Sequence, residues 1–541
     1  MKNGQTHIIQ RQILEVEIPG GSEHWHWQER LSRFAREVFA PHLEALLDRH
    51  STPGEVIRIE KLELTADLLT IENWEKLLLD DLLRKVEQAL PTRPDDGKQP
   101  GAVEGQVRRE TTAENLLEQF FFFLKNGTLP WQTPTSVRQN FEPVMLKVFE
   151  ENRTPRRVEE FREMLRSQRV RQRLAAQFSG RFLVKLVRVF FKEKIAQVAE
   201  NQDFLSEISK RAGIPAEEME PVFWTLFFED ASGIRETSMP GVADAEQTLL
   251  QKVWLRFLTK NPERAAAVVQ AFFQQKKVEG TTGRMWPPPL QKLFEALQAS
   301  PAKAESLVVW LKSQTGSFEK LVALHAGELE TLTAKLSDMP VAKLKKWLDA
   351  KAGKAALPPT KQEQLTEKEQ ALEPVETEGI YVDNAGLVLL HPFLPTFFEE
   401  LNVVKNGRMT NPHRAVHLLQ YLATGQSATP EYELPLNKLL CGLPLEEPLT
   451  RKLRLTQKEK TEAEKLLEAV IRHWSVLMNT SPEGLQGTYL CREGKLSRRG
   501  HEDWQLQVEQ KGFDILLNDL PWSISMIKLP WMGGMLWVEW Q

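Results

Sequence analysis

Two short stretches near the start of the chain alternate between apolar and polar residues, and a longer stretch with helical apolar spacing follows each of them. Alternation predicts strands, and a period of 3.6 predicts amphipathic helices. The four predicted elements, in chain order, are a strand at 7–18, a helix at 25–48, a strand at 55–64 and a helix at about 72–90. This order predicts a small α+β domain over residues 1–90.

The middle of the chain, residues 111–350, has apolar residues at helix spacing between many prolines. Thr111 and Glu114 have the spacing of a capping box, and Gly127 stands where a helix C-cap belongs. The longest stretch without proline runs from Arg156 to Ile214, which excludes one unbroken rod. The pattern predicts a series of helical hairpins or bundles, and we find no fixed-period repeat in the sequence.

Two polar stretches separate this helical region from the ends of the chain. Residues 91–110 are rich in Pro and Gly, and residues 351–378 are rich in Lys, Glu, Gln and Pro. The first stretch has no apolar period, and both stretches are predicted to be linkers.

The last predicted unit, residues 379–541, begins with helices. Asn411-Pro412 is a helix start with Gly425 as the matching end, and Thr456 with Glu459 has capping-box spacing. After residue 500 the apolar period changes to two. The alternating residues are Trp504, Leu506 and Val508 in one run and Trp522, Ile524 and Met526 in another, and Gly533-Gly534 is a hairpin signal between two Trp-bearing runs.

The predicted fold is therefore mainly α and multidomain. A helical middle region lies between a small N-terminal α+β domain and a C-terminal α+β unit that ends in an antiparallel sheet. A chain of 541 residues is long enough for three or more such units, and 41% apolar residues are enough to build their cores.

Charge and cysteine content limit the environment of the protein. The net charge is only -4, so the whole chain is neither a polyanion mimic nor a general nucleic-acid binder. Two cysteines, Cys441 and Cys491, exclude a disulfide framework and favour a reducing compartment. The first residues lack an apolar signal core, and no segment has the ~18 apolar residues of a membrane span. We expect a cytoplasmic protein with no membrane contact.

Candidate catalytic and metal sites are weak. His24 and His26 flank Trp25, but no third ligand with suitable spacing is nearby. His413 and His417 have zinc-site spacing, but Arg414 stands where the general-base Glu of H-E-x-x-H would be, so one packed and one exposed histidine is expected. Cys441 and Cys491 are interpreted as small hydrophobic residues. We expect no enzyme activity, no metal and no cofactor.

A basic stretch runs from Arg153 to Lys194, with 13 Lys or Arg against 4 Glu, a difference of +9. The favoured interpretation is a solvated helix face, since apolar residues interleave with the charges at core spacing. An acidic protein partner is the next hypothesis, and nucleic acid the last. Arg169, Arg171 and Arg173 are the candidate contact residues, expected to be exposed so that their charge has little effect on stability.

Tryptophans are concentrated at the end of the chain, where five of the 15 lie in residues 504–541. Alternation along a strand sends neighbouring side chains to opposite faces, so these rings cannot all be buried in so small a sheet. We predict that outward-facing rings dock on another protein or on a second copy of the chain. The candidates are Trp522, Trp531, Trp537 and Trp540. In the alternative, the helices of residues 384–474 cover both faces of the sheet and no partner is involved.

Several segments, in the same order, resemble the contractile injection system tape-measure family of phage-tail-like particles. The segments that carry the resemblance are HIIQRQILEVEIPG (7–20), IRIEKLEL (57–64), FFFLKNGTLPW (121–131), NAGLVLLHPFLPTFFEELNV (384–403), HRAVHLLQYLATG (413–425), YELPLNKLLCGL (432–443), AVIRHWSVLMNTSPEGL (469–485), REGKL (492–496) and LPWSISMIKLPWM (520–532). Residues 195–378 contribute little.

The resemblance implies a structural, non-enzymatic assembly protein that lies inside the tail tube, sets the tube length and links the baseplate hub to the tube. Its expected partners are the tail tube and baseplate hub proteins, and association with a second copy stays open. The expected location is the bacterial cytoplasm and then the assembled particle. A baseplate adaptor or chaperone-like binding module without a ruler role is the alternative, and an enzyme using His413, His417 and Cys441 is the third hypothesis.

Overall fold

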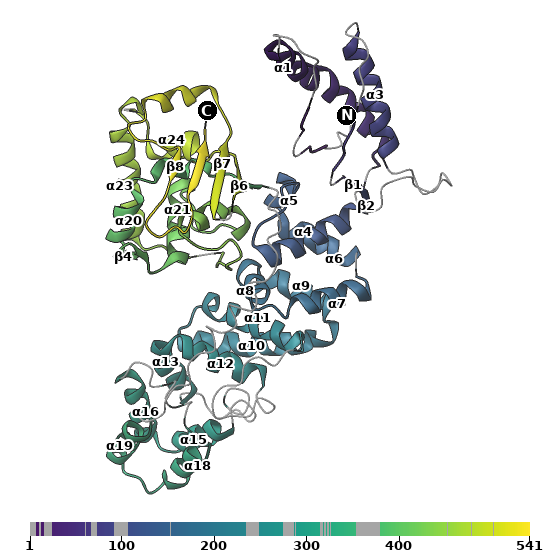
Figure 1. Cartoon of the computed structure of the whole chain (residues 1–541). Helices are drawn as coiled ribbons and strands as arrows, with labels where there is room; N and C mark the ends of the chain where they lie inside the picture. Colours follow the sequence, from purple (N-terminus) through teal and green to yellow (C-terminus); the bar gives the residue numbers. More distant parts are fainter. Residues whose placement is uncertain are drawn as a thin grey trace. The chain divides into compact units, whose positions relative to one another are not determined.

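A computed structural model gives the fold of most of the chain (Figure 1). The residues that it describes are 7–9, 12–15, 24–52, 54–59, 61–65, 73–90, 107–151, 153–233, 248–273, 286, 288–313, 318, 321, 324, 326–352, 379–451, 453–477, 479–500 and 502–540. The described part is mainly helical, as the sequence predicts.

By compactness, the chain divides into two units. The first comprises Met1–Gln119 and Pro134–Gln139, and the second comprises Phe120–Thr133 and Asn140–Gln541. The helical middle region and the C-terminal region, which the sequence predicts as separate domains, therefore fall in one compact unit. The predicted domain boundaries themselves remain predictions.

The first unit has a helical core beside a two-stranded sheet. Its elements are α1 (His24–Arg33), the π-helix η1 (Phe34–Phe39), α2 (Ala40–His50), β1 (Glu55–Ile59), α3 (Trp74–Ala89), β2 (Val107–Thr111), α5 (Thr135–Gln139) and, through Gln119, α4 (Thr112–Asn126). Phe34, Leu46, Trp74 and Val86 form the centre of the apolar core, since helical spacing puts them on the inner faces of η1, α2 and α3.

The two-stranded sheet of this unit includes a strand that the sequence analysis did not predict. β1 pairs antiparallel with β2, with Ile57 opposite Arg109. β2 begins within the predicted linker 91–110, so the linker prediction is wrong at that end; residues 91–106 lie outside the described residues. Val107 is the only apolar residue of β2. The pairing therefore depends on main-chain hydrogen bonds, which need no alternation of apolar and polar residues in the sequence. The described residues of the predicted strand 7–18 form no strand, and the rest of it is not described.

Local helix signals are confirmed in α4. The amide of Glu114 donates to Oγ1 of Thr111 at 3.1 Å, and the amide of Thr111 donates to the Glu114 carboxylate at 3.0 Å, which is the predicted capping box. At the other end, Gly127 has a φ of 75° and its amide donates to the carbonyl of Phe123. Glycine ends the helix there because it takes the left-handed conformation without strain.

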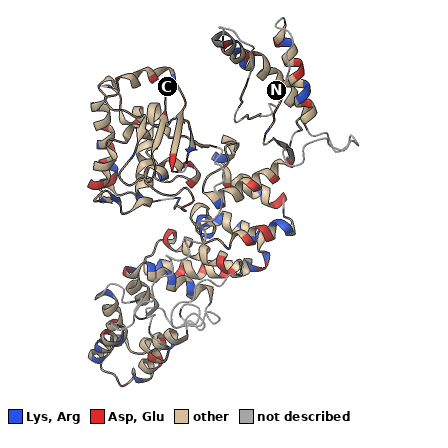
Figure 2. Cartoon of the chain, in the orientation of Figure 1, with Lys and Arg blue, Asp and Glu red and all other residues tan. Residues whose placement is uncertain are grey.

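Short helices follow α4 in the second unit. They are α6 (Phe141–Glu151), α7 (Pro155–Met164), α8 (Gln168–Gln177), α9 (Gly180–Phe190), the 3-10 helix η3 (Lys192–Lys194), α10 (Ile195–Ala212), α11 (Ala216–Ala231), α12 (Leu249–Lys260), α13 (Pro262–Phe273), α15 (Pro288–Gln298), α16 (Pro301–Ser313), α18 (Ala326–Lys335) and α19 (Val341–Ala352). Lys and Arg are interspersed with Asp and Glu along them (Figure 2). Among the described residues of this region the longest helix, α10, has 18 residues, and α7, α13, α15 and α16 each begin at a proline.

These helices pack in a staggered series. α6 packs against α9, α8 against α11, α10 against α13, α13 against α16, and α16 against α19. Each of these contacts joins a helix to one a short distance further along the chain. The packing is like that of a helical solenoid, in which each further pair of helices makes the stack longer.

Residues 379–540, here called the C-terminal segment, contain helices packed on a sheet. The elements are β3 (Ile380–Val382), η6 (Ala385–Leu390), α20 (Leu394–Glu400), β4 (Val404–Lys405), β5 (Arg408–Met409), α21 (Pro412–Thr424), η7 (Glu431–Glu433), α22 (Pro435–Leu440), α23 (Gln457–His473), η8 (Ser475–Leu477), α24 (Pro482–Leu485), the π-helix η9 (Gln486–Leu490), β6 (Gly494–Arg499), β7 (Asp503–Val508), η10 (Gly512–Asp519), β8 (Met526–Ile527) and β9 (Leu536–Glu539). Within it, the predicted starts of α21 and α23 and the glycine end of α21 are confirmed.

The sheet has the order β3-β6-β7-β9-β8, and β6, β7 and β8 can be seen together in Figure 1. It is mixed, because β7 and β9 are parallel, so the prediction of a wholly antiparallel sheet is wrong. The chain crosses over through η10 and β8 before β9 pairs, a connection that strand alternation does not encode. The predicted Trp522–Met526 strand is also wrong, since β8 begins only at Met526.

One face of this sheet packs on the helices and the other is polar. Leu496, Leu506 and Val538 lie in register across three strands and are buried. Lys495, Gln505, Gln507, Trp537 and Glu539 lie on the opposite face, as the period of two requires. In the described part of the chain, no helix is both long and apolar enough to cross a membrane.

Candidate functional site

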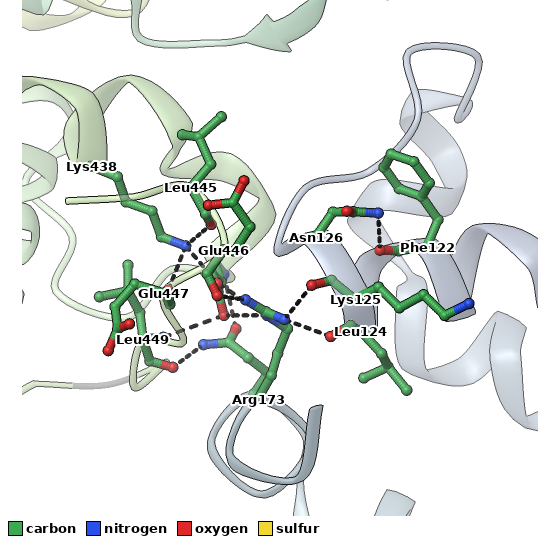
Figure 3. Close-up of polar contacts among 12 residues, drawn as sticks. Phe122, Leu124, Lys125, Asn126, Arg173, Lys438, Leu445, Glu446, Glu447 and Leu449 are labelled. Carbon is green, nitrogen blue, oxygen red and sulfur yellow. Dashed lines mark hydrogen bonds and ion pairs between the residues drawn. The ribbon is translucent and has the colours of Figure 1, made fainter. Parts of the chain in front are cut away.

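Arg173, on α8, is fully buried although arginine usually remains at the surface. Its Nε donates to the Glu431 carboxylate, with both oxygens at 3.1 Å. Its Nη1 donates to the carbonyls of Leu124 and Lys125, and its Nη2 to the carbonyl of Glu446 (Figure 3). One side chain therefore joins α8, the end of α4 and two turns of the C-terminal segment.

Arg173 completes the carboxyl end of α4. The carbonyls of Leu124 and Lys125 belong to the last helical turn, where no backbone amide of the helix is available to them. The guanidinium supplies donors there and places positive charge at the negative end of the helix dipole. Gly127 follows at once, and a Cβ built on it would lie 2.9 Å from Nη2 of Arg173 and 2.5 Å from Oε1 of Glu431. Glycine is required at this position both by its positive φ and by lack of space.

Glu431 is fully buried and has a second cationic partner, Lys438 of α22. The Lys438 Nζ donates to Oε1 of Glu431 at 2.5 Å and to the carbonyls of Leu445 and Glu447 at 2.7 Å each. These three acceptors match the three N–H bonds of an ammonium group. Burial lowers the pKa of Lys438, and the adjacent Glu431 carboxylate opposes that shift.

The cluster holds two cations and one carboxylate away from water. Backbone carbonyls around Arg173 and Lys438 face the surplus positive charge. A buried ion that loses its partner costs several kcal/mol, roughly 3–5 in measured cases. Removal of any one of the three charged side chains from the closed contact is therefore costly, and this makes the contact specific for the segments that supply them.

Further polar contacts surround the cluster. Gln177 donates to the carbonyl of Leu449 at 2.6 Å and accepts from the amide of Glu431 at 2.8 Å. Arg451 donates to the Glu142 carboxylate of α6 at 2.9 Å. The ring of Tyr432 packs edge-on against Phe123 and also contacts Phe141. We call this surface, residues 429–451 against α4, α6 and α8, the docking contact.

Two of the three predicted basic contact residues are structural. Arg171 and Arg173 are buried, so the expectation that all three candidates are exposed is wrong, while Arg169 is half-buried. The Arg171 Nη1 donates at 2.8 Å to the carbonyls of Leu165 and Arg166, just past the end of α7. Both arginines thus satisfy carbonyls at the ends of other helices, a role that net charge along the sequence does not reveal.

The predicted docking tryptophans mostly face inward. Trp522 donates to the carbonyl of Leu389 at 3.1 Å, and Trp531 donates to the carbonyl of Leu440 at 2.8 Å. Trp540 is buried and donates to Asp514. Trp537 alone of the four lies on the polar sheet face, where the guanidinium of Arg499 stacks 4.3 Å from its ring centre. Docking through these rings stays a prediction, and Trp537 is the residue best placed for it.

The structure does not bring the other candidate residues together as a catalytic site. His417 is buried and His413 is about two-fifths exposed, 3.8 Å from Glu447. Burial raises the pKa of both thiols, that of Cys441 well above its usual value, which disfavours the nucleophilic thiolate. Among the described residues, no three His, Cys, Asp or Glu side chains are grouped for a metal ion. The side chains of His24 and His26 lie outside the description.

Sequence reasoning did not identify Glu431, Lys438 and Gln177. One signal was available, since Lys438 stands within LPLNKLL, where a charged residue among apolar ones indicates a buried ion that needs a partner. Which residue is that partner cannot be deduced from local spacing. All partners of the cluster are groups of the same chain, so the cluster holds distant segments of the chain together.

Comparison with known proteins agrees with a structural role. The family model described as contractile injection system tape measure protein matches residues 6–540. No curated protein and no solved structure matches the chain.

Proposed function

Because the chain belongs to the contractile injection system tape measure family, we propose that it is a non-catalytic assembly subunit that sets the length of the tail tube. In this role it links the baseplate hub to the growing tube, first in the bacterial cytoplasm and then inside the particle. Its direct partners are the tube and hub proteins. The match over nearly the whole chain is the observation that carries the proposal.

The staggered helix packing supports a ruler. A protein that sets tube length needs a length of its own that increases with the number of residues. The packing of α10 on α13, α13 on α16 and α16 on α19 gives a stack whose length increases with each added helix. The longest of these helices, α10, has 18 residues, or about 27 Å at 1.5 Å per residue. The stack, rather than any one helix, is therefore the element that carries length.

Deletion of residues 288–352 tests the proposal. The segment contains α15, α16, α18 and α19, and its ends adjoin residues outside the described ranges, so the cuts do not interrupt a described helix. Drawn out as helix, it would span at most roughly 100 Å. A ruler predicts that particles still form and that their tubes are shorter, by no more than about that length.

A second variant separates length from packing. In it, a Gly/Ser linker with the same number of residues replaces 288–352, which restores the chain length without the helices. A baseplate adaptor or chaperone-like module predicts unchanged tube length in both variants. That outcome, measured by electron microscopy of purified particles, would overturn the ruler and favour the adaptor.

For contact with an acidic tube or hub surface, the exposed stripe of α9 is better placed than the buried arginines. Arg181, Lys185 and Arg188 of α9 are exposed at helix spacing, and the exposed Lys192 follows in η3. The opposite face of α9 is apolar and buried, so the charged face points toward solvent. We assign the acidic-partner hypothesis to these four residues. Arg169 is half-buried and lies on the preceding helix, α8.

A further inference from the structure

The docking contact joins a body that has an apolar core of its own. The core of the C-terminal segment contains only residues from 380 to 540, and the side chains packed around it come from the same range. None of α4, α6 and α8 contributes to that core. The contact also buries Tyr432 against Phe123 and Phe141, but the core itself needs no side chain from these helices. This indicates that the segment stays folded when the contact opens.

The charges of the cluster are divided so that each side keeps partners after separation. On the C-terminal side, Lys438 remains paired with Glu431 and bonded to the carbonyl of Leu445. On the helical side, Arg173 keeps the carbonyls of Leu124 and Lys125. Opening breaks the Arg173–Glu431 pair but leaves neither charge isolated, and water replaces the rest. This makes opening less costly than removal of one charged side chain from the closed contact.

Beside the packing of Tyr432 on Phe123 and Phe141, the contact depends on particular hydrogen-bond acceptors. Arg173 meets a carboxylate and the carbonyl of Glu446, and Gln177 bonds Leu449 and Glu431 through both ends of its amide. A different segment would have to present the same acceptors, a carboxylate and two carbonyls, because otherwise Arg173 would be buried without its carboxylate. Residues 429–451 carry the set, and so do the same residues in any other copy of the chain.

We propose that α4, α6 and α8 form a docking surface that recognises residues 429–451 as a separable body, and that the C-terminal segment of a second copy occupies this surface when the chain's own segment leaves it. Such exchange of an identical element links copies without any new interface. It gives an assembly protein a way to join chains through a contact that each chain already makes with itself. The proposal concerns contacts between copies and is independent of whether the protein measures length.

A capture experiment tests the exchange. The host is the full chain with Glu431→Gln, whose own segment docks weakly while its helical surface is intact. The probe is a fluorescently labelled wild-type segment, residues 379–541, whose core is self-contained. We expect this host to bind the probe at least about tenfold more tightly than the wild-type host, in which the attached segment competes at high effective concentration.

Two matched controls locate the binding. A host with both Arg173→Met and Glu431→Gln lacks the central donor and is expected to lose the probe. A probe with Glu431→Gln is expected to bind at least about a hundredfold more weakly, because it leaves Arg173 without a carboxylate. Equal binding by all hosts would place the site elsewhere, and no binding to the Glu431→Gln host would overturn the exchange.

Hydrogen exchange on the full wild-type chain tests separability without any isolated part. The amides of Glu431 and Arg451 donate across the contact, to Gln177 and to the carbonyl of Ala176, whereas Leu506 lies in the core strand β7. Opening with both bodies folded predicts that the first two amides exchange at least about tenfold faster than that of Leu506. Equal rates would mean that the contact opens only on global unfolding, and the proposal would be wrong.

Discussion

Gly127 and Glu431 approach so closely that a β-carbon on Gly127 would lie 2.5 Å from Oε1 of the carboxylate. They are far apart in the sequence, one at the end of α4 and one at the start of η7. The sequence explains Gly127 as a helix cap, which accounts for its φ of 75°. Only the structure shows that the same glycine leaves room for a buried ion cluster.

Gly127→Ala should destabilise the second unit more than a helix cap alone would. Gly425 is the matched control, since its φ is 70° and no atom lies within 4 Å of a Cβ there. Gly425→Ala is expected to cost about 1–2 kcal/mol from the left-handed backbone. Gly127→Ala should cost roughly 1–3 kcal/mol more, because the new methyl group overpacks the cluster. Denaturant unfolding of the two variants measures the difference. Equal losses in the free energy of unfolding would show that the cluster rearranges to accept the methyl group without strain.

Arg171→Gln should lower stability, whereas Arg169→Gln should not. Arg171 is buried, satisfies the carbonyls of Leu165 and Arg166, and lies 3.8 Å from the Glu229 carboxylate. Its loss leaves two helix-end carbonyls without this donor and leaves the buried Glu229 carboxylate with Arg256 at 3.9 Å, at an expected cost of about 1–3 kcal/mol. Arg169 is half-buried, and its replacement should change the free energy of unfolding by about 0.5 kcal/mol or less. Thermal unfolding of both variants checks the contrast; similar midpoints would contradict the assigned role of Arg171.

Charge reversal on the α9 stripe should reduce incorporation into particles. Lys185→Glu with Arg188→Glu changes two exposed charges, each worth up to about 1 kcal/mol in a contact, so binding to an acidic partner should weaken roughly tenfold or more. The control is Lys345→Glu with Lys346→Glu, the same change at exposed positions of α19. The amount of chain in purified particles is the measurement. Equal incorporation of both double variants would support the solvated-face interpretation.

Trp531→Ser and Trp537→Ser should separate folding from docking. Trp531 packs against Phe398 and donates to the carbonyl of Leu440, so its truncation is expected to cost about 3 kcal/mol. Trp537 lies on the polar sheet face under Arg499, and its loss should cost less than about 1.5 kcal/mol. If the sheet docks on a partner, only Trp537→Ser keeps the fold and loses the association, as size-exclusion chromatography would show. A fully retained association in that variant removes Trp537 from the contact.

Stability should fall as the pH drops below 6.5, in part because of His417. Burial lowers the pKa of His417 to about 4, and the nearby charges of His413 and Arg414 add to the effect. The unfolded chain therefore binds the proton first, starting near pH 6.5, and the folded chain loses stability progressively down to about pH 4. The contribution of this one group reaches roughly 3 kcal/mol. Urea titrations from pH 7 to pH 4 should show a shallower decline in His417→Gln than in the control His413→Gln; parallel curves would exclude His417 as the cause.

The sequence by itself determined the features that a few neighbouring residues control. Thr456 with Glu459, Asn411 and Gly425 begin and end helices as predicted, because a cap is a contact within one turn of the chain. The alternation of Trp504, Leu506 and Val508 predicted β7 for the same local reason. The family resemblance also rested on such segments, and it extended to a match over residues 6–540.

The tertiary structure decided which distant surfaces meet. Arg173 and Glu431 are separated by 258 positions, and no local pattern states that one is the counterion of the other. The parallel pairing of β7 with β9 is likewise set by the path of the chain between them. A charged residue has the same letter whether water or a buried carboxylate surrounds it, so a basic stretch alone could not distinguish the buried Arg173 from the exposed Lys185. Burial is a property of the whole packed chain, and only the folded structure fixes it.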